Sequence, residues 1–368
     1  MKREEIVKAL SQVIEPQSKR DILSNHMVEN LRIEENSVQF DLVLASMNSP
    51  HKFELHAACT QAVQNIYPDA IVNVHMRAAS NQKAQQQAPS RKLPQVKNVI
   101  AVASGKGGVG KSTVSVNLAL GLKALGAKVG ILDADIYGPS IPIMMGMQGQ
   151  KPQVKKLNGK STILPLQAYD IPMISMGFIV EPEQAVVLRG PRLAGILNQF
   201  ISEVYWEALD FLIVDLPPGT GDVQLSLAQS VPITGAVIVS TPQDVAVADA
   251  MKAISMFQME SIEVPILGVV ENMSWFTPLE LPDNKYYLFG KGGGKKLAKL
   301  GETVLLGQVP IVQSIREAGD AGVPVMLSDD PQSEPTKQAI LDISKNLLRQ
   351  VAIRHEYLEP TKIVKLKD

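Results

Sequence analysis

The sequence predicts an α/β protein: a P-loop doubly wound, mostly parallel sheet, preceded by a small α+β domain. From residue 98 onward, continuous apolar runs alternate with helical stretches, as in strands that are buried on both faces. A glycine- and lysine-rich segment, GKGGVGKS at 105–112, lies between the first apolar run and a helical stretch. A glutamine-rich segment at 79–97 separates this part from the N-terminal residues.

Residues 1–78 predict the small α+β domain. Helical spacing of apolar residues over 3–14 and 52–66 brackets a strand-like alternation at 38–45, and a second alternation follows at 70–76. The order helix, strand, strand, helix, strand indicates a small sheet covered by helices. Segment 79–97 has no acidic or aromatic residue and predicts a flexible linker.

Residues 98–354 predict the P-loop domain, and 355–368 a charged C-terminal tail. Helical stretches such as 112–126 alternate with the apolar runs, which is the rhythm of repeated βαβ units. The predicted strands are 98–104, 128–135, 211–217, 235–241 and 265–272.

Composition excludes several classes of function. The 36 Lys and Arg residues nearly balance the 37 Asp and Glu residues, so the chain has no strong nucleic-acid signal. A single cysteine, Cys59, excludes an intrachain disulfide framework and a metal centre held by several cysteines of one chain. No apolar run approaches the length of a membrane span or a signal-peptide core, so we expect a cytoplasmic protein without a membrane anchor.

The segment at 105–112 fits the phosphate-loop pattern G-x-x-x-x-G-K-[ST] through Gly105, Gly110, Lys111 and Ser112. Glycines let backbone amides wrap a phosphate, and the helix N-terminus adds partial positive charge. Lys111 is expected to reach the β- and γ-phosphates, and Ser112 to ligate Mg²⁺. The predicted nucleotide contacts in this loop are Gly105, Lys106, Gly107, Gly108, Val109, Gly110, Lys111, Ser112 and Thr113.

Aspartates follow two of the predicted strands. Asp215 ends the strand in FLIVDLPPGTGD, is the predicted second Mg²⁺ ligand, and is followed in the same loop by Asp222. Asp133 and Asp135 end the strand in LDADIYGPS, where an open α/β sheet places its ligand. A cap of the strand end is the alternative role for either residue.

The loop contains an additional lysine, Lys106, which precedes Lys111. With this lysine the loop resembles the deviant Walker A loop of an ATPase group that includes nitrogenase iron protein, MinD and ParA. The resemblance implies an ATP-dependent homodimer in which Lys106 acts on the partner's nucleotide. It also implies that Asp135 orients water, so that Lys106, Lys111, Asp135 and Asp215 form the catalytic set. Asn272 and Pro310 match positions that hold adenine in this group, although an ordinary turn explains them equally well.

Several longer segments carry a second resemblance. They are VIEPQSKRDIL at 13–23, DADIYGPS at 133–140, LRGP at 188–191, DLPPGTGD at 215–222, ENMSWF at 271–276 and FGKGGG at 289–294. The last five resemble the Mrp/ApbC family of ATPases, and the first resembles the small iron–sulfur-assembly domain that precedes many bacterial members. The resemblance implies binding of iron–sulfur clusters and their transfer to apoproteins, with such clients or assembly factors as partners.

The sequence departs from that family where the cluster ligands belong. Members carry Cys-x-x-Cys after the ENMS segment, but here Pro278 and Leu281 occupy the two positions. Cys59 has apolar neighbours at helical spacing, which indicates a core cysteine. Glu280 and Asp283 lie in the altered loop and offer oxygen ligands, so the cluster-binding residues stay open.

A MinD- or ParA-like positioning switch without a cluster is the alternative function. Such a switch needs a membrane-binding amphipathic helix or a basic DNA-binding face. The amphipathic stretch 336–351 is the candidate helix, and a core-facing helix is its simpler interpretation.

Overall fold

The computed structural model describes most of the 368 residues, in two compact units, Met1–Pro89 and Ser90–Asp368. Several sequence-derived features lie outside the described residues: most of segment 79–97, LRGP at 188–191, Asp222, and the tail from 359. The residues that the structure does not describe are 2, 17–18, 26, 34–36, 45–51, 69, 79–92, 94, 137, 158, 179–194, 196–199, 222–223, 226–227, 229–230, 279, 282 and 359–368.

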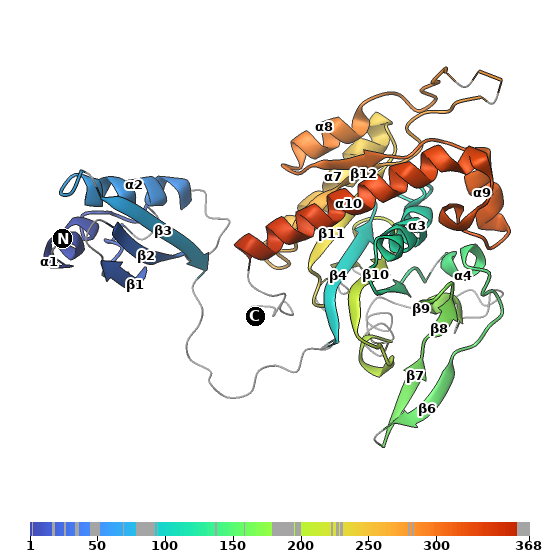
Figure 1. Ribbon diagram of the computed structural model, residues 1–368, viewed down its shortest axis with the longest axis horizontal. Helices are drawn as coiled ribbons and strands as arrows, with labels where there is room; N and C mark the ends of the chain where they lie inside the picture. The colour runs from blue at the N-terminus through green and yellow to red at the C-terminus, as the bar shows by residue number, and fades with distance from the viewer. Residues whose placement is uncertain are drawn as a thin grey trace. The chain divides into compact units, whose positions relative to one another are not determined.

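The first unit is a small sheet with two helices, in the predicted order (Figure 1). Strand β2 lies between β1, which runs antiparallel to it, and β3, which runs parallel. Alternation in β2 buries Val38, Phe40 and Leu42 in a core that the helices cover. The elements are α1 (Arg3–Leu10), β1 (Val28–Ile33), β2 (Ser37–Leu44), α2 (Lys52–Gln64) and β3 (Ile71–Ala78).

The second unit is built on a mostly parallel sheet, which confirms the predicted fold class. In the described residues this sheet has eight strands in the order β13-β12-β11-β4-β10-β5-β9-β8, and only β8 pairs antiparallel, with β9. The strands are β4 (Val96–Ala103), β5 (Val129–Asp133), β8 (Leu166–Ala168), β9 (Ile171–Ser175), β10 (Leu209–Asp215), β11 (Gly235–Ser240), β12 (Ile266–Glu271) and β13 (Leu305–Gln308).

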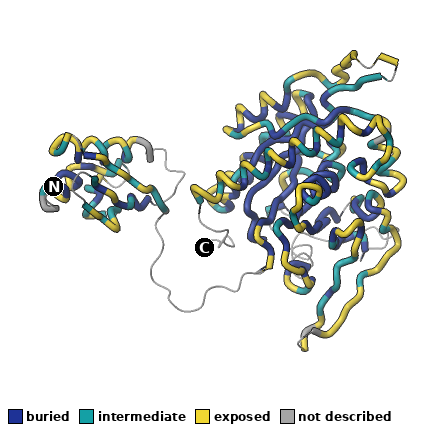
Figure 2. Tube along the Cα trace, in the orientation of Figure 1, coloured by how far each residue is buried: buried dark blue, intermediate teal, exposed yellow. Residues whose placement is uncertain are grey.

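The central strands are buried along nearly their whole length, as their continuous apolar sequences predict (Figure 2). They alternate in sequence with α-helices and short 3₁₀ segments. These are α3 (Lys111–Ala124), α4 (Ile141–Met144), η1 (Met176–Phe178), α7 (Asp244–Gln258), α8 (Gly293–Leu300), α9 (Gln313–Asp320), η2 (Val325–Leu327), η3 (Pro331–Ser333) and α10 (Glu334–Tyr357).

Helix α10 contains the amphipathic stretch 336–351, and its apolar stripe faces the core. Ile340, Ile343, Leu347 and Val351 are all buried there. The helix lies against α3, where a Cβ on Gly121 would come 2.4 Å from Ser344 Oγ. The core-facing interpretation is therefore confirmed. Within the described part of the chain, no helix combines the length and apolarity that a membrane span requires.

A two-stranded hairpin that the sequence analysis missed lies between α4 and β8. It consists of β6 (Gln153–Leu157) and β7 (Lys160–Leu164), paired antiparallel. Within its unit the hairpin extends away from the large sheet, and most of it is exposed (Figures 1 and 2).

Candidate nucleotide-binding site

The loop between β4 and α3 requires its glycines. Gly108 and Gly110 have φ values of +80° and +79°, a region that L side chains rarely adopt. A Cβ on Gly105 would lie 2.1 Å from the backbone carbon of Asp249. The glycine spacing therefore follows from backbone conformation and close packing, and it produces a loop that runs into the N-terminus of α3.

The other predicted contacts of the loop occupy different environments. Val109 is buried, whereas Gly107 is exposed. Lys106 and Thr113 are half-buried, and the backbone carbonyl of Lys106 accepts a hydrogen bond from Ser104 Oγ at 2.9 Å. Among the described residues, no ion pair of the Lys106 ammonium is formed.

Asn272 supports the loop from the end of β12. Its Nδ2 donates to the carbonyl of Val109 at 2.9 Å, and a Cβ on Gly110 would lie 2.2 Å from the same nitrogen. The amide of Val309 donates a hydrogen bond to the carbonyl of Glu271 at the end of β12. Pro310 is the next residue in the chain and is buried. The structure thus brings both predicted base-contact segments to one place and gives Asn272 a direct contact with the phosphate loop.

Asp215 joins the parts of the site. It is fully buried at the end of β10, between Val102 of β4 and Asp133 of β5. Its Oδ2 accepts hydrogen bonds from Lys111 Nζ and Ser112 Oγ, both at 2.7 Å. The structure therefore brings together the predicted Lys111, Ser112 and Asp215.

A second hydroxyl fixes the same carboxylate. Ser115 Oγ lies 2.5 Å from Asp215 Oδ1 and 3.1 Å from the carbonyl of Lys111. The sequence analysis missed this residue, although its position four residues after Lys111 puts it on the same helix face. Because Ser115 binds Oδ1, the carboxylate is oriented with Oδ2 toward Lys111 and Ser112.

Lys111 lies between two carboxylates in a buried site. The Lys111 Nζ lies 3.6 Å from Asp135 Oδ2 and 2.7 Å from Asp215 Oδ2, so one ammonium forms ion pairs with both aspartates. Removing one partner of a buried ion pair costs about 3–5 kcal/mol, because the other charge is left without compensation. The ammonium is therefore strongly held, and a polyanionic ligand offers it a replacement.

Asp133 has a different role from Asp135. It accepts hydrogen bonds from Ser175 Oγ at 2.7 Å and from the backbone amide of Asp135 at 3.1 Å. Burial, and next the negative charge of Asp215, raises the pKa of Asp133 to about 8. Through these two hydrogen bonds Asp133 caps the strand end and fixes the loop that carries Asp135.

The turn after β10 packs beside the phosphate loop. The amide of Gly219 donates to the carbonyl of Ser104 at 2.9 Å. Gln224, which the sequence analysis also missed, donates from Nε2 to the carbonyls of Pro217 at 3.0 Å and Pro218 at 2.7 Å. The described part of this turn is therefore tied directly to the loop that would hold the phosphates.

Comparison with known proteins assigns the chain to a family. A family model described as NUBPL iron-transfer P-loop NTPase matches residues 95–348, and one described as iron-sulfur cluster assembly protein matches residues 3–76. The chain belongs to the NUBPL-type iron-transfer NTPase family. A relative from Synechocystis named iron-sulfur cluster carrier protein is 44% identical over 349 residues, which cover 95% of this chain and 97% of the relative.

Solved structures agree with the NTPase fold. A nucleotide-binding protein from Archaeoglobus fulgidus in complex with ADP is 36% identical with a TM-score of 0.57, covering 66% of this chain and 93% of that one. MinD from Pyrococcus horikoshii, complexed with Mg-ADP, is 21% identical with a TM-score of 0.50, covering 70% and 99%. The second likeness is one of fold alone.

The altered loop of this NUBPL-type NTPase offers no thiol. The amide of Leu281 donates to the carbonyl of Pro278 at 3.1 Å, so the two residues form a turn, and Leu281 is 47% exposed. Glu280 lies within this turn, and Asp283 follows it. Among the described residues, no group of three or more His, Cys, Asp or Glu side chains is placed to hold a metal ion.

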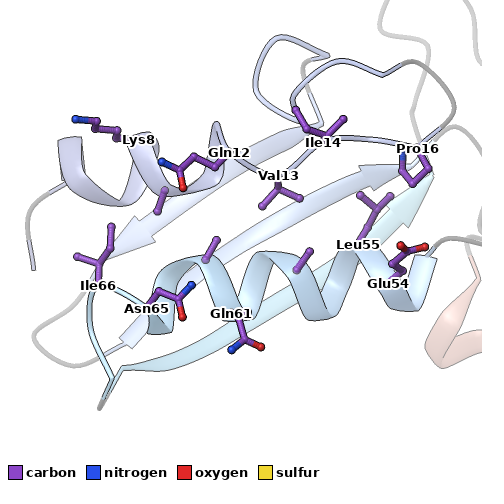
Figure 3. Close-up of a pocket in the computed structure, with 13 residues that line it drawn as sticks. Lys8, Gln12, Val13, Ile14, Pro16, Glu54, Leu55, Gln61, Asn65 and Ile66 are labelled. Carbon is purple, nitrogen blue, oxygen red and sulfur yellow. The ribbon is translucent and has the colours of Figure 1, made fainter.

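Cys59 lies in the core of the small unit. It is fully buried, and burial raises the pKa of its thiol to about 12. Cys59 belongs to α2, which together with α1 borders a groove of about 690 Å³ (Figure 3). Lys8, Glu54 and Gln61 line this groove, and Cys59 does not. The prediction of a core cysteine is confirmed.

Alanine substitutions at two glycines separate backbone strain from steric overlap in the phosphate loop. At Gly108, where a Cβ meets no atom within 4 Å, the positive φ alone should lower the free energy of unfolding by about 1–2 kcal/mol. Gly110→Ala should cost more, because its methyl group also overlaps Asn272. Urea denaturation of both variants without nucleotide measures the difference; equal losses would contradict the steric role of Asn272.

Asp133→Asn should change how stability depends on pH. The carboxyl titrates at about 8 in the folded state but near 3.8 when unfolded, so the folded state holds a proton that the unfolded state loses between these values. The contribution of Asp133 to the free energy of unfolding should therefore fall as the pH rises from about 4 to 8, by at most about 1.4 kcal/mol per pH unit. Asp133→Asn should lack this pH-dependent contribution. Urea denaturation of both proteins across this range measures the difference; parallel profiles would contradict the raised pKa of Asp133.

Proposed function

We propose that this NTPase binds and hydrolyses ATP with Mg²⁺, and that it binds and transfers iron–sulfur clusters to apoproteins or assists that transfer. Nucleotide binding is supported by one observation above all: Lys111 and Ser112 both donate hydrogen bonds to Asp215 Oδ2 at the end of a buried strand. Family membership and relatives named as cluster carriers support the second part.

The residues present fit a nucleotide. The loop has no side chain where Gly108 and Gly110 turn, so backbone amides and the N-terminus of α3 are available to phosphate oxygens. Ser112 and Asp215 would hold Mg²⁺ with oxygen ligands, the type that this ion prefers. When bound, the ion would neutralise charge on the phosphates.

Hydrolysis would use the ammonium groups and carboxylates around the loop. Lys111 would leave Asp215 for the β- and γ-phosphates, where it stabilises negative charge that develops in the transition state. Asp135, within 3.6 Å of the Lys111 ammonium, would orient the attacking water. Lys106, half-buried at the loop and without an ion pair among the described residues, would reach the nucleotide of a second copy in a homodimer.

The nucleotide base would lie near the end of β12. Asn272 donates to the loop through Nδ2 and would use its amide oxygen toward adenine, while Pro310 supplies an apolar surface beside it. Because Asn272 also donates a hydrogen bond to Val109, binding of the base would influence the position of the phosphate loop.

Cluster transfer in this chain would not use the usual cysteine pair. Pro278 and Leu281 have no ligand atoms in their side chains, and the Cys59 thiol is buried with a raised pKa. Thiolate is the form that binds iron, so Cys59 is a poor ligand. The cluster, which is the cargo, would be held with thiols from outside the chain, or its transfer between other proteins would be driven by the nucleotide cycle.

Transfer to an acceptor tests the proposed function. Under anaerobic conditions, wild-type protein treated with ferric iron, sulfide and a small thiol, which reduces part of the iron as the cluster forms, should speed activation of an apo-[4Fe–4S] dehydratase in the presence of Mg-ATP. Lys111→Ala should lose the ATP-dependent part, since it lacks the ammonium for the phosphates, whereas Cys59→Ser should act like wild type.

Two outcomes would contradict this account. If wild-type protein leaves the acceptor's activation rate unchanged while still hydrolysing ATP, cluster transfer is wrong and the nucleotide site stands. If Cys59→Ser abolishes both bound acid-labile sulfide and acceptor activation, a cysteine of this chain is a ligand after all. Circular dichroism of the two variants shows whether either has lost its fold.

A further inference from the structure

The hairpin formed by β6 and β7, with its flanking residues 151–164, is here called the basic hairpin. From Ile136 to Tyr169 the sequence contains four lysines and no Asp, Glu or Arg. Three of these lysines, Lys151, Lys155 and Lys156, are exposed in the structure, and the fourth is Lys160. The segment is therefore positively charged, whereas the positive and negative charges of the whole chain nearly balance, with a net charge of −1.

One edge of the basic hairpin is covered, and within the described parts of the chain the other edge is open. On β7, the carbonyl of Ile163 accepts a hydrogen bond from the amide of Tyr205 at 2.9 Å, and Ile163 also forms a bridge with Val204. Strand β6 has β7 on one side, and no described strand pairs with its other side. An exposed strand edge of this kind can take up an additional strand.

The register identifies the open backbone groups. Ile163, whose carbonyl points away from β6, is paired with Val154. In an antiparallel ladder the two members of such a pair both direct N–H and C=O away from each other. Val154, and by alternation Lys156, therefore present their backbone N–H and C=O groups at the open edge of β6.

The side chains of β6 place charge on both faces of this edge. Lys155 lies on one face, and Val154 and Lys156 lie on the other, because successive residues of a strand alternate. Val154 is 63% exposed, so the edge also offers an apolar side chain. Lysines on an edge oppose indiscriminate pairing, and they favour a strand that brings negative charge.

We propose that the open edge of β6 binds an extended acidic segment of a partner protein, which adds to the basic hairpin as a third strand. Backbone hydrogen bonds at Val154 and Lys156 would align the segment, and its carboxylates would meet Lys155 and Lys156 on the two faces. This docking surface is separate from the nucleotide site and does not depend on ATP hydrolysis.

The chemistry of the basic hairpin favours a polypeptide over a nucleic acid. Residues 151–164 contain no arginine to bind phosphates in a bidentate manner and no aromatic side chain on which bases could stack. Outward N–H and C=O groups at alternate residues match the spacing of an extended peptide. Because the ion pairs would be exposed, binding should weaken as salt concentration rises.

Fluorescence anisotropy with the full-length chain tests the proposal. The probe is a fluorescein-labelled decapeptide of Glu-Glu-Val-Val repeats, which places carboxylates on both faces of an extended strand. The matching decapeptide of Gln-Gln-Val-Val repeats is the uncharged control, and the two are called the Glu-Val and Gln-Val probes. At low salt, the Glu-Val probe should bind, and the double variant Lys155→Glu, Lys156→Glu should weaken binding at least about tenfold through like-charge repulsion. The matched control, Lys295→Glu with Lys299→Glu on exposed positions of α8, should bind like wild type.

A second variant tests the strand-addition geometry. Val154→Pro removes the outward N–H, and proline is tolerated at such edge positions because that N–H makes no bond within the hairpin. It should weaken the probe about threefold to tenfold, the effect of one lost hydrogen bond, and leave ATP hydrolysis unchanged. Amide hydrogen exchange over 153–157 should slow when the probe binds wild type.

Other results would overturn the proposal. These are no binding of the Glu-Val probe, equal binding to the Gln-Val probe, or unchanged binding by both hairpin variants. Preferential binding of a DNA duplex or an RNA strand of equal charge, with loss in the Lys155, Lys156 variant, would assign the basic hairpin to nucleic acid instead. Circular dichroism confirms that the variants fold.

Discussion

The fully buried carboxylate of Asp215 is the constraint on which the arrangement of the site depends. A charge at the end of a central strand needs compensation, and it obtains three donors from one helix: Lys111, Ser112 and Ser115. These donors fix the position of the first turn of α3 relative to β10. The phosphate loop, which connects β4 to that turn, is thereby held at the carboxyl edge of the sheet.

A second support acts from the other side of the loop. Asn272, at the end of β12, holds the Val109 carbonyl and fills the space that a side chain at Gly110 would need. Asp133 at the end of β5 accepts a hydrogen bond from the Asp135 amide and so fixes the segment that carries Asp135. Three strand ends therefore position the loop, the Lys111 ammonium and a nearby carboxylate, which explains how a flexible glycine-rich sequence gives a defined site.

Sequence reasoning predicted the elements with strong local signals. The buried parallel strands, the phosphate loop and the meeting of Lys111, Ser112 and Asp215 all follow from apolar runs and residue spacing. Ser115 was missed because a serine in a helix has many possible roles, and only the fold shows it facing Asp215. The difference between Asp133 and Asp135 depends on burial and on neighbouring charge, which spacing does not contain. The basic hairpin was missed because β6 is short and polar and lies away from the core.

In the proposed mechanism, Asp215 holds Lys111 until ATP binds the ammonium and Mg²⁺ binds the carboxylate. Calorimetric titration of ATP into wild type and Asp215→Asn, with and without Mg²⁺, measures this exchange. Without Mg²⁺, the variant should bind ATP at least as tightly as wild type, because Lys111 no longer has to leave a carboxylate; Mg²⁺ should then strengthen binding only in wild type. An equal gain from Mg²⁺ in both proteins would contradict the account.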